Sequence, residues 1–432
     1  MSHSPRLLAC LTLSVAAISA LAQKAPVTDL KSRLAAIPGV VSVTAPTNPR
    51  LQKDTFVVMF DQPVDPLNPK GARFQQRLFL RHAAFDQPMI LGTEGYEAGG
   101  PDGGELEGMF DRPNVLTVEH RYFGKSVPTP LVWQHLTIKN AAADMHRIVT
   151  AFKSLYRGKW VSTGVSKGGQ TALFFKCFYP NDVDATVAYV APINLGQEDP
   201  RLISFFQTIG DEAIRKRMLD FQIALLKRED EIIPLLGQKP EQYSMGLAKA
   251  YEYGVLEYPF SYWQYSSAAL PIPAPDAPAK EMADAYKRIG ALYFYSDAGR
   301  KQFGPFYYQA YTEIGYYNYD ITDLKPYLKA NPNPTNMDLL PPGLKENIVY
   351  KPNTLAFVYR YLQYKAQNVA FVYGETDAWS ATQMELLGRT NAVKLVVKGG
   401  NHGAGVQDAA PKQKEQFYSA LDKWMSTKLK RL

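Results

Sequence analysis

A serine between two glycines is the first feature of this chain that could carry out chemistry. Residues 164–168 read Gly-Val-Ser-Lys-Gly, which matches the pattern G-x-S-x-G. The motif follows an apolar run at residues 160–162 and precedes an expected helix at residues 168–178. A sharp turn from strand to helix strains the serine backbone and leaves no room for neighbouring Cβ atoms, which explains the glycines. The context predicts Ser166 as a nucleophile, at a helix N-terminus that favours developing negative charge.

A serine hydroxyl becomes an effective nucleophile only when a base removes its proton. His402 lies in a glycine-rich loop, residues 398–403, just after the last expected strand. The glycines allow this loop to bring an imidazole over the edge of a sheet. We therefore predict His402 as the base. Structural or supporting roles are expected for three other histidines, His82, His120 and His146.

The base in turn needs a carboxylate that fixes its tautomer. Asp377 follows an apolar run at residues 369–373, where it would lie above the carboxyl edge of the sheet. Glu375 is the rival, but it lies nearer to the strand. The order serine, aspartate, histidine is that of α/β-hydrolases and differs from the orders in chymotrypsin and subtilisin. We predict a triad of Ser166, Asp377 and His402.

An acyl-transfer site also needs two backbone N–H groups that bind the oxyanion. The residue after the nucleophile supplies one of them, which predicts the N–H of Lys167. The other is expected from the loop after the third strand, residues 92–97, where Gly95 permits a close approach. Either Gly95 or Tyr96 could be this second donor.

The elements that would position these residues follow from the apolar pattern. Early strands followed by alternating strands and helices favour an α/β class, a mostly parallel sheet with helices on both faces. Before about residue 53 we expect only a polar lead. Strands are expected at residues 55–60, 73–80, 88–91, 115–118, 160–162, 186–190, 369–373 and 393–397. Helices are expected at residues 138–156, 168–178, 211–227, 382–387 and 412–425.

A long insertion separates the two halves of this pattern. It covers residues 198–365 and holds 20 of the 27 tyrosines of the chain. An insertion at one point of a parallel sheet is expected to form a cap over the carboxyl edge, where such sheets place their sites. The predicted domains are a signal peptide at residues 1–22, an α/β-hydrolase domain at residues 23–197 and 366–432, and a mainly helical, tyrosine-rich cap at residues 198–365.

The first 22 residues have the features of an export signal. Arg6 precedes an apolar run at residues 7–20, and Ala20-Leu21-Ala22 fits the rule for a cleavage site. The run is too short for a permanent membrane span. We therefore expect an exported protein, periplasmic or secreted, of bacterial origin. The net charge of +7 is spread along the chain without a dense basic block, so no nucleic-acid partner is expected.

The cysteine content and the absence of cofactor motifs indicate how the protein is stabilised and whether it needs a cofactor. Removal of the signal leaves Cys177 as the one cysteine, so the protein must rely on core packing rather than on an internal disulfide. An apolar neighbourhood predicts a buried thiol there. The sequence has no HExxH, CxxC pair or P-loop, and no GxGxxG with its strand and acidic partner, so we expect neither a metal nor an organic cofactor.

The motifs of this chain resemble those of the secreted bacterial tripeptidyl aminopeptidases, which include the prolyl tri/tetrapeptidyl aminopeptidases. The resemblance spans nearly the whole mature chain. It is carried by residues 118–126 (Val-Glu-His-Arg-Tyr-Phe-Gly-Lys-Ser), 164–169, 373–379 (Tyr-Gly-Glu-Thr-Asp-Ala-Trp) and 399–403. Residues 119–122 are also similar to the related lysosomal Pro-X carboxypeptidase and dipeptidyl peptidase family.

This resemblance implies hydrolysis of short peptides from a free N-terminus, often after proline, with Ser166, Asp377 and His402 as the triad. The sequence departs from other proline-cleaving aminopeptidases in lacking their Gly-Gly-x-Gly-Gly loop; residues 93–96 read Thr-Glu-Gly-Tyr. An aminopeptidase must also pair the substrate ammonium with carboxylates. Candidates near the expected pocket mouth are Glu94, Glu97, Glu198 and Asp199.

Three alternatives remain open from the sequence. An esterase or lipase uses the same triad on the same fold. A Pro-X carboxypeptidase would need a cation in the cap to bind the substrate carboxylate. A non-catalytic binding protein could retain the fold, although an intact triad argues against it.

Overall fold

The computed structural model describes residues 29–48, 50–51, 54–266, 270–290 and 292–432. The predicted signal peptide lies outside these residues. Within them, no helix is both long and apolar enough to cross a membrane.

In the described part of the chain, nine strands form one sheet in the order β1-β2-β3-β5-β4-β6-β7-β8-β9. The first strands, through the β3–β5 pair, are antiparallel, and every pair from β5–β4 to β8–β9 is parallel. The central parallel strands are buried on both faces, as helices on both faces of a sheet require. The strands are β1 (Val40–Thr44), β2 (Thr55–Pro63), β3 (Arg73–Arg81), β4 (Met89–Thr93), β5 (Asn114–Val118), β6 (Trp160–Val165), β7 (Ala185–Tyr189), β8 (Val369–Gly374) and β9 (Val393–Val397). The predicted α/β class is confirmed.

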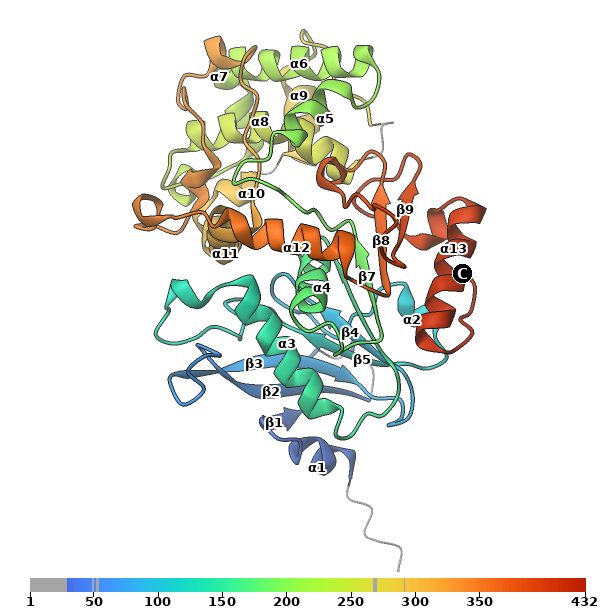
Figure 1. Ribbon diagram of the computed structural model, residues 1–432. Helices are drawn as coiled ribbons and strands as arrows, with labels where there is room; N and C mark the ends of the chain where they lie inside the picture. Colours follow the sequence, from blue (N-terminus) through green and yellow to red (C-terminus); the bar gives the residue numbers. More distant parts are fainter. Residues whose placement is uncertain (1–28, 49, 52–53, 267–269, 291) are drawn as a thin grey trace, which may run out of the picture.

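Helices cover both faces of this sheet (Figure 1). The apolar sides of α3 and α4 pack on one face, and α2 and α13 pack on the other. The helices are α1 (Leu30–Ala35), α2 (Leu106–Met109), α3 (Ile138–Phe152), α4 (Lys167–Phe178), α5 (Arg201–Thr208), α6 (Glu212–Lys227), α7 (Glu229–Ile232), α8 (Leu247–Tyr265), α9 (Ala279–Ile289), α10 (Leu292–Tyr295), α11 (Asp297–Gln309), α12 (Pro352–Tyr364) and α13 (Pro411–Met425). Short 3₁₀ or π turns are η1 (Trp133–His135), η2 (Ile233–Leu236), η3 (Pro240–Gln242), η4 (Ala310–Ile314), η5 (Lys325–Tyr327), η6 (Asn336–Leu339), η7 (Lys345–Asn347), η8 (Ala378–Thr382) and η9 (Val406–Asp408).

Two expectations from the sequence need correction. The expected polar lead contains α1 and β1, and β1 extends the sheet by pairing with β2 at its edge. The helix expected at residues 382–387 does not form. Asp377 caps η8 in its place, and the Met384 N–H then donates to the Tyr373 hydroxyl at 3.0 Å, which holds this segment against β8.

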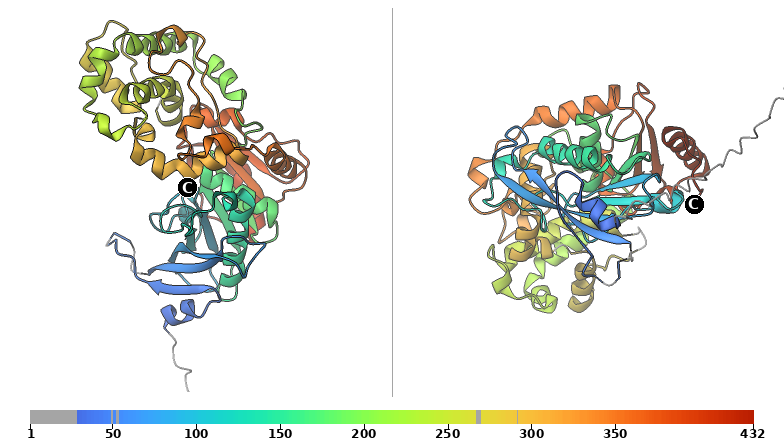
Figure 2. Two further views of the ribbon diagram at one scale, coloured as in Figure 1. Left: turned by 90° about the vertical axis from the view of Figure 1, so that its left-hand side faces the viewer. Right: turned by 90° about the horizontal axis from the view of Figure 1, so that it is seen from below.

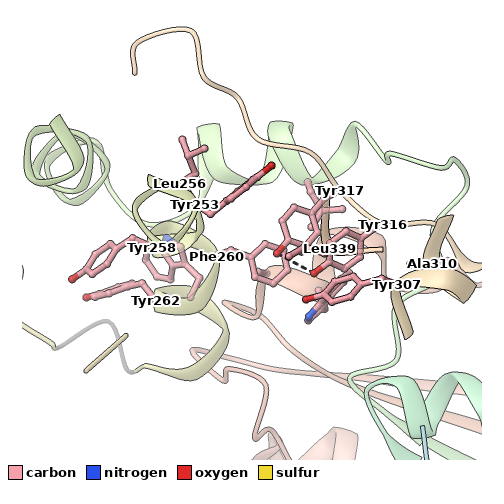
Figure 3. Close-up of a cluster of buried hydrophobic side chains, with 14 of the residues drawn as sticks. Tyr253, Leu256, Tyr258, Phe260, Tyr262, Tyr307, Ala310, Tyr316, Tyr317 and Leu339 are labelled. Carbon is pink, nitrogen blue, oxygen red and sulfur yellow. Dashed lines mark hydrogen bonds between the residues drawn. The ribbon is translucent and has the colours of Figure 1, made fainter. Parts of the chain in front are cut away.

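The segment between β7 and β8, residues 198–365, is called the helical insert below. Most of it, from α5 to α11, rises as a lobe beyond the sheet (Figure 1 and the left view of Figure 2), whereas its last helix, α12, packs against α4. Its centre is α8, surrounded by aromatic side chains, and Phe260 stacks on Tyr317 with ring centroids 4.2 Å apart (Figure 3). The same apolar cluster includes Phe371 and Tyr373 of β8, so the insert and the sheet share one continuous core. The division into domains stays a prediction.

Candidate active site

Ser166 occupies the sharp turn between β6 and α4. Its φ of 56° and ψ of −122° lie outside the regions that residues with a side chain favour. Its N–H donates to the Tyr189 carbonyl at 2.8 Å, which ties the turn to β7. A Cβ on Gly164 would lie 2.4 Å from the backbone of Gly168, and a Cβ on Gly168 would lie 2.5 Å from the Thr93 oxygen. Only glycine fits at these two positions, and the half-buried Ser166 is presented at the N-terminus of α4.

His402 and Asp377 meet between the loops that follow β9 and β8. His402 Nδ1 lies 2.8 Å from Asp377 Oδ2. The Asp377 carboxylate is fully buried, and its Oδ1 accepts a hydrogen bond from the Trp379 N–H at 3.2 Å. Burial raises the pKa of Asp377, while the adjacent imidazole acts in the opposite direction. A carboxylate in this position fixes the proton on Nδ1 and leaves Nε2 free to accept another.

The helical insert holds the histidine loop in place. The His402 N–H donates to the Gln264 carbonyl in the last turn of α8 at 3.0 Å. The Tyr265 ring approaches the His402 ring edge-on, with centroids 6.1 Å apart. The position of the His402 side chain therefore depends on the insert as well as on the sheet.

A cavity of about 320 Å³ lies between the insert and the carboxyl edge of the sheet, and both Ser166 and His402 line it. Most of the lining is apolar and aromatic. It includes Phe260, Tyr265, Phe294, Phe303, Phe306, Tyr307, Tyr316, Tyr317 and Trp379. Several of these rings pack against one another around Phe260, where Figure 3 shows Tyr307, Tyr316 and Tyr317 together. Such a lining can bind a compact apolar group such as a proline ring.

Glu257 is the one acidic side chain among the described residues that line this cavity. It lies in α8 and is 8% exposed. Its carboxyl accepts hydrogen bonds from the Tyr317 hydroxyl at 2.7 and 2.8 Å and from the Tyr319 hydroxyl at 3.0 Å. Burial raises the pKa of Glu257 to about 7, although both hydroxyls act in the opposite direction. No sequence pattern indicates this residue, because nothing in the local pattern of α8 distinguishes it.

Lys167 is buried beside Ser166. Its Nζ donates to the Gly95 carbonyl at 2.6 Å and lies over the rings of Tyr96 and Phe123. Desolvation lowers the pKa of Lys167 well below its ordinary value. A Cβ on Gly95 would lie 2.5 Å from the Lys167 Cβ, so glycine is required for this close contact. The lysine side chain thus fixes the loop after β4 against the start of α4.

With this geometry established, the comparisons with known proteins identify the family. A family model described as PS-10 peptidase S37 matches residues 23–430. The chain belongs to the S37 peptidase family. It is therefore a serine peptidase built on the α/β-hydrolase fold.

The curated relatives of this S37 peptidase differ widely in coverage. The prolyl tri/tetrapeptidyl aminopeptidase of Streptomyces mobaraensis is 34% identical, over 93% of this chain and 86% of its own. A prolyl carboxypeptidase-like protein of Caenorhabditis elegans is 30% identical, but over only 27% of this chain and 29% of its own. Among solved structures, the proline iminopeptidase of Mycobacterium smegmatis is similar with a TM-score of 0.39 and 11% identity, covering 85% of this chain and 97% of its own. At that level of similarity, the fold assignment rests on the strand order of the S37 peptidase itself.

The four acidic residues that the sequence suggested for the substrate ammonium are absent from the lining of the Ser166 cavity. Glu97 and Glu198 are exposed, and Glu97 lies 3.2 Å from Arg77. The Asp199 carboxylate is bound by the Arg201 guanidinium at 2.7 Å, and the pKa of Asp199 is lowered although burial acts in the opposite direction. Glu94 lines a second cavity, which also includes His402 in its lining. Their assignment to the ammonium stays a prediction, and Glu257 is the carboxylate that the structure offers inside the cavity.

Within the described ranges, no group of three or more histidine, cysteine, aspartate or glutamate side chains could hold a metal ion. The expectation that no cofactor is needed stays a prediction.

Proposed function

We propose that this chain is an exported serine exopeptidase that removes tri- or tetrapeptides from free N-termini and prefers to cleave after proline. The observation that carries this proposal is a single cavity lined by Ser166, His402 and the buried carboxyl of Glu257. The similarity to the Streptomyces prolyl tri/tetrapeptidyl aminopeptidase over most of both chains supports it. The predicted signal at residues 1–22 supports export to the periplasm or the exterior.

In the proposed mechanism, the triad transfers the acyl part of the substrate to water in two steps. His402 takes the proton of the Ser166 hydroxyl as its oxygen attacks the scissile carbonyl, and then donates this proton to the leaving amine. Water then attacks the acyl-enzyme by the same route and releases the short peptide. The 2.8 Å contact with Asp377 supports this role, because it orients the imidazole and stabilises its charged form.

The N–H groups of Lys167 and Tyr96 are the proposed oxyanion donors. A trans peptide unit directs its C=O and N–H to opposite sides. The Lys167 Nζ donates to the carbonyl of the peptide unit that joins Gly95 to Tyr96, so the N–H of this unit points away from Nζ. Tyr96 also lines the cavity that contains Ser166, whereas Gly95 does not. Of the two donors that the sequence left open, these contacts favour Tyr96.

Glu257 is the proposed anchor for the substrate ammonium. A charged amine entering the cavity would meet one carboxyl there, already oriented by the hydroxyls of Tyr317 and Tyr319. An ammonium beside this carboxyl favours its ionised form and offsets the cost of burying it. Between Glu257 and Ser166 the aromatic lining would hold the few residues of the acyl part, with proline against the rings. A carboxypeptidase would instead need a free cation here, and the Lys167 Nζ already donates to a carbonyl.

The test is hydrolysis, by the purified mature protein, of Ala-Ala-Pro linked to a chromogenic amide, with free and acetylated N-termini. The account predicts cleavage of the free-amine substrate, at least about a hundredfold loss on acetylation, and no cleavage by the Ser166→Ala variant. Glu257→Gln should remove most of the difference between the two substrates. Cleavage of an acyl ester without cleavage of either amide would identify an esterase and overturn the proposal.

A further inference from the structure

A second cavity, of about 220 Å³, lies next to the proposed catalytic residues, and no role has yet been assigned to it. It shares two lining residues, Val165 and His402, with the cavity that holds Ser166. The rest of its lining comes from the ends of β4, β6 and β7, the loop before α2 and the loop that carries His402.

The lining of this cavity carries several acidic side chains. Three carboxyl groups line it, those of Glu94, Asp102 and Glu105, and no lysine or arginine is among its described lining residues. Burial, together with the charges of Asp102 and Glu119, raises the pKa of Glu94 to about 7. Glu105 accepts hydrogen bonds from the Val406 N–H, and burial raises its pKa as well. A cation bound here would stabilise the ionised form of each group.

A buried hydroxyl in the same wall also lacks a partner. Tyr189 lines the cavity, is 6% exposed, and its hydroxyl makes no hydrogen bond among the described residues. The charge of Glu105 acts on this hydroxyl, and burial raises the pKa of Tyr189 well above its ordinary value. The group therefore stays protonated and can donate. A buried donor without an acceptor is costly, and the carbonyl of a bound peptide would supply one.

The position of the cavity relative to His402 indicates which part of a substrate could reach it. In the proposed mechanism, the acyl part occupies the aromatic cavity, and His402 donates a proton to the amine of the departing peptide. The departing peptide therefore begins beside His402, on the side away from the aromatic cavity. The second cavity begins at that residue.

We propose that this cavity, lined by Glu94, Asp102, Glu105 and Tyr189, binds the first residues after the scissile bond and selects substrates with lysine or arginine there. The carboxylates pair with the cationic side chain, and the Tyr189 hydroxyl donates to a backbone carbonyl of the departing peptide. This inference rests on the proposed function, since it assigns the leaving side of the same reaction.

The test compares three peptides with free N-termini, Ala-Ala-Pro-Xaa-Ala-Gly with lysine, glutamine or glutamate as Xaa, in one competition assay read by mass spectrometry. The wild type should cleave the lysine peptide with kcat/KM about tenfold above the glutamate peptide, with glutamine between them. In a Glu94→Gln, Asp102→Asn double variant this ratio should fall to within about twofold of unity. Asp111→Asn, an exposed residue outside the cavity, makes a matched control that should keep the wild-type ratio.

The lysine-to-glutamate ratio is measured within each variant, so a general loss of activity cancels. A wild-type ratio near one, or a ratio that the double variant leaves unchanged, would overturn the subsite. The chromogenic amide has no amino-acid residue after the scissile bond, so its cleavage does not depend on the proposed subsite. It therefore tests the proposed function separately from the subsite. Cleavage of the amide with equal rates on the three peptides would defeat the subsite alone, whereas no cleavage of the amide or of any peptide would defeat the proposed function and the subsite with it.

Discussion

Asp377 and Glu375 are two carboxylates close together in the chain with very different surroundings. Asp377 is fully buried against His402, whereas Glu375 is exposed and accepts a hydrogen bond from the Gly399 N–H at 2.8 Å. Asp377→Asn should lower kcat by about four orders of magnitude, because an amide no longer fixes the imidazole tautomer. Glu375→Gln, which can still accept the Gly399 hydrogen bond, is the matched control and should retain nearly full activity. Equal losses in the two variants, measured with the chromogenic amide, would contradict the assignment.

Glu257 should make the stability of the folded protein depend on pH. Its pKa is about 7 in the folded state, against an ordinary value of 4.5, so between these values the folded chain holds a proton that the unfolded chain has released. This contribution to stability is largest at low pH and is lost as pH rises from about 4.5 to about 7, each pKa unit corresponding to about 1.4 kcal/mol. Glu257→Gln has no such titration. Urea unfolding should show the variant gaining stability relative to the wild type as pH rises from 4.5 to 8, and a pH-independent difference would refute this.

In this account, Lys167 contributes to the proposed oxyanion site indirectly, because it fixes the loop after β4 through the Gly95 carbonyl. Lys167→Met keeps the approximate volume but leaves the Gly95 carbonyl without its donor, so the Tyr96 N–H loses its fixed direction. Loss of one oxyanion donor lowers kcat by about a hundredfold or more, and KM should change little. A peptide aldehyde, which forms a tetrahedral adduct with the serine, should lose affinity by a similar factor. A rise in KM alone, with aldehyde affinity retained, would show that the lysine has only a structural role.

The site residues that the sequence predicts, and Glu257, which only the structure brings to the cavity, differ in how local their sequence signal is. Ser166 lies in a five-residue motif, and His402 and Asp377 follow apolar strands within short glycine-containing loops. Glu257 lies within a helix rich in tyrosines, and its partners Tyr317 and Tyr319 are about sixty residues further along the chain. Only the packing of the insert brings them together, and no spacing in the sequence encodes it.

At the level of elements, the turn between β6 and α4 depends on glycines that no residue with a side chain can replace without a clash. Gly164→Ala would place a Cβ within 2.4 Å of the Gly168 backbone and 2.6 Å of the Thr93 oxygen, and backbone atoms cannot move aside at low cost. We expect destabilisation of about 2–4 kcal/mol in urea unfolding, together with loss of activity. Gly99→Ala is the control, because nothing lies within 4 Å of its added Cβ, and it should change stability by less than about 0.5 kcal/mol. Similar effects of the two substitutions would contradict this account of the turn.

The elements that could be predicted are those with a strong apolar signal. Each central strand is a run of buried residues, and α3 presents a clear apolar side. The apolar signal is weak in β1, where Val43 is the one buried residue. The sequence therefore predicts a polar lead in place of this strand. The segment after Asp377 was predicted to be helical, but a side-chain capping bond and the Tyr373 hydroxyl determine its path. Such contacts depend on tertiary structure and produce no periodic pattern of apolar residues in the sequence.

At the scale of the whole molecule, the insert and the sheet pack together around the site. They share an apolar cluster, and the last turn of α8 holds the histidine loop. The cavity that contains Ser166 lies beneath the insert, and the proposed function predicts that a substrate enters it as an unfolded chain end. In the proposed reaction, the distance from Glu257 to Ser166 then sets how many residues are removed.

The most direct test of this account uses an unlabelled peptide of twelve residues with a free N-terminus and proline at position three. The purified mature protein is incubated with the peptide, and the first products are identified by mass spectrometry. The account predicts an N-terminal tripeptide and a nine-residue remainder, with no product when the N-terminus is acetylated or Ser166 is replaced by alanine. Loss of a single residue from the C-terminus, or cleavage at internal sites of the acetylated peptide, would contradict an exopeptidase anchored at the substrate amine.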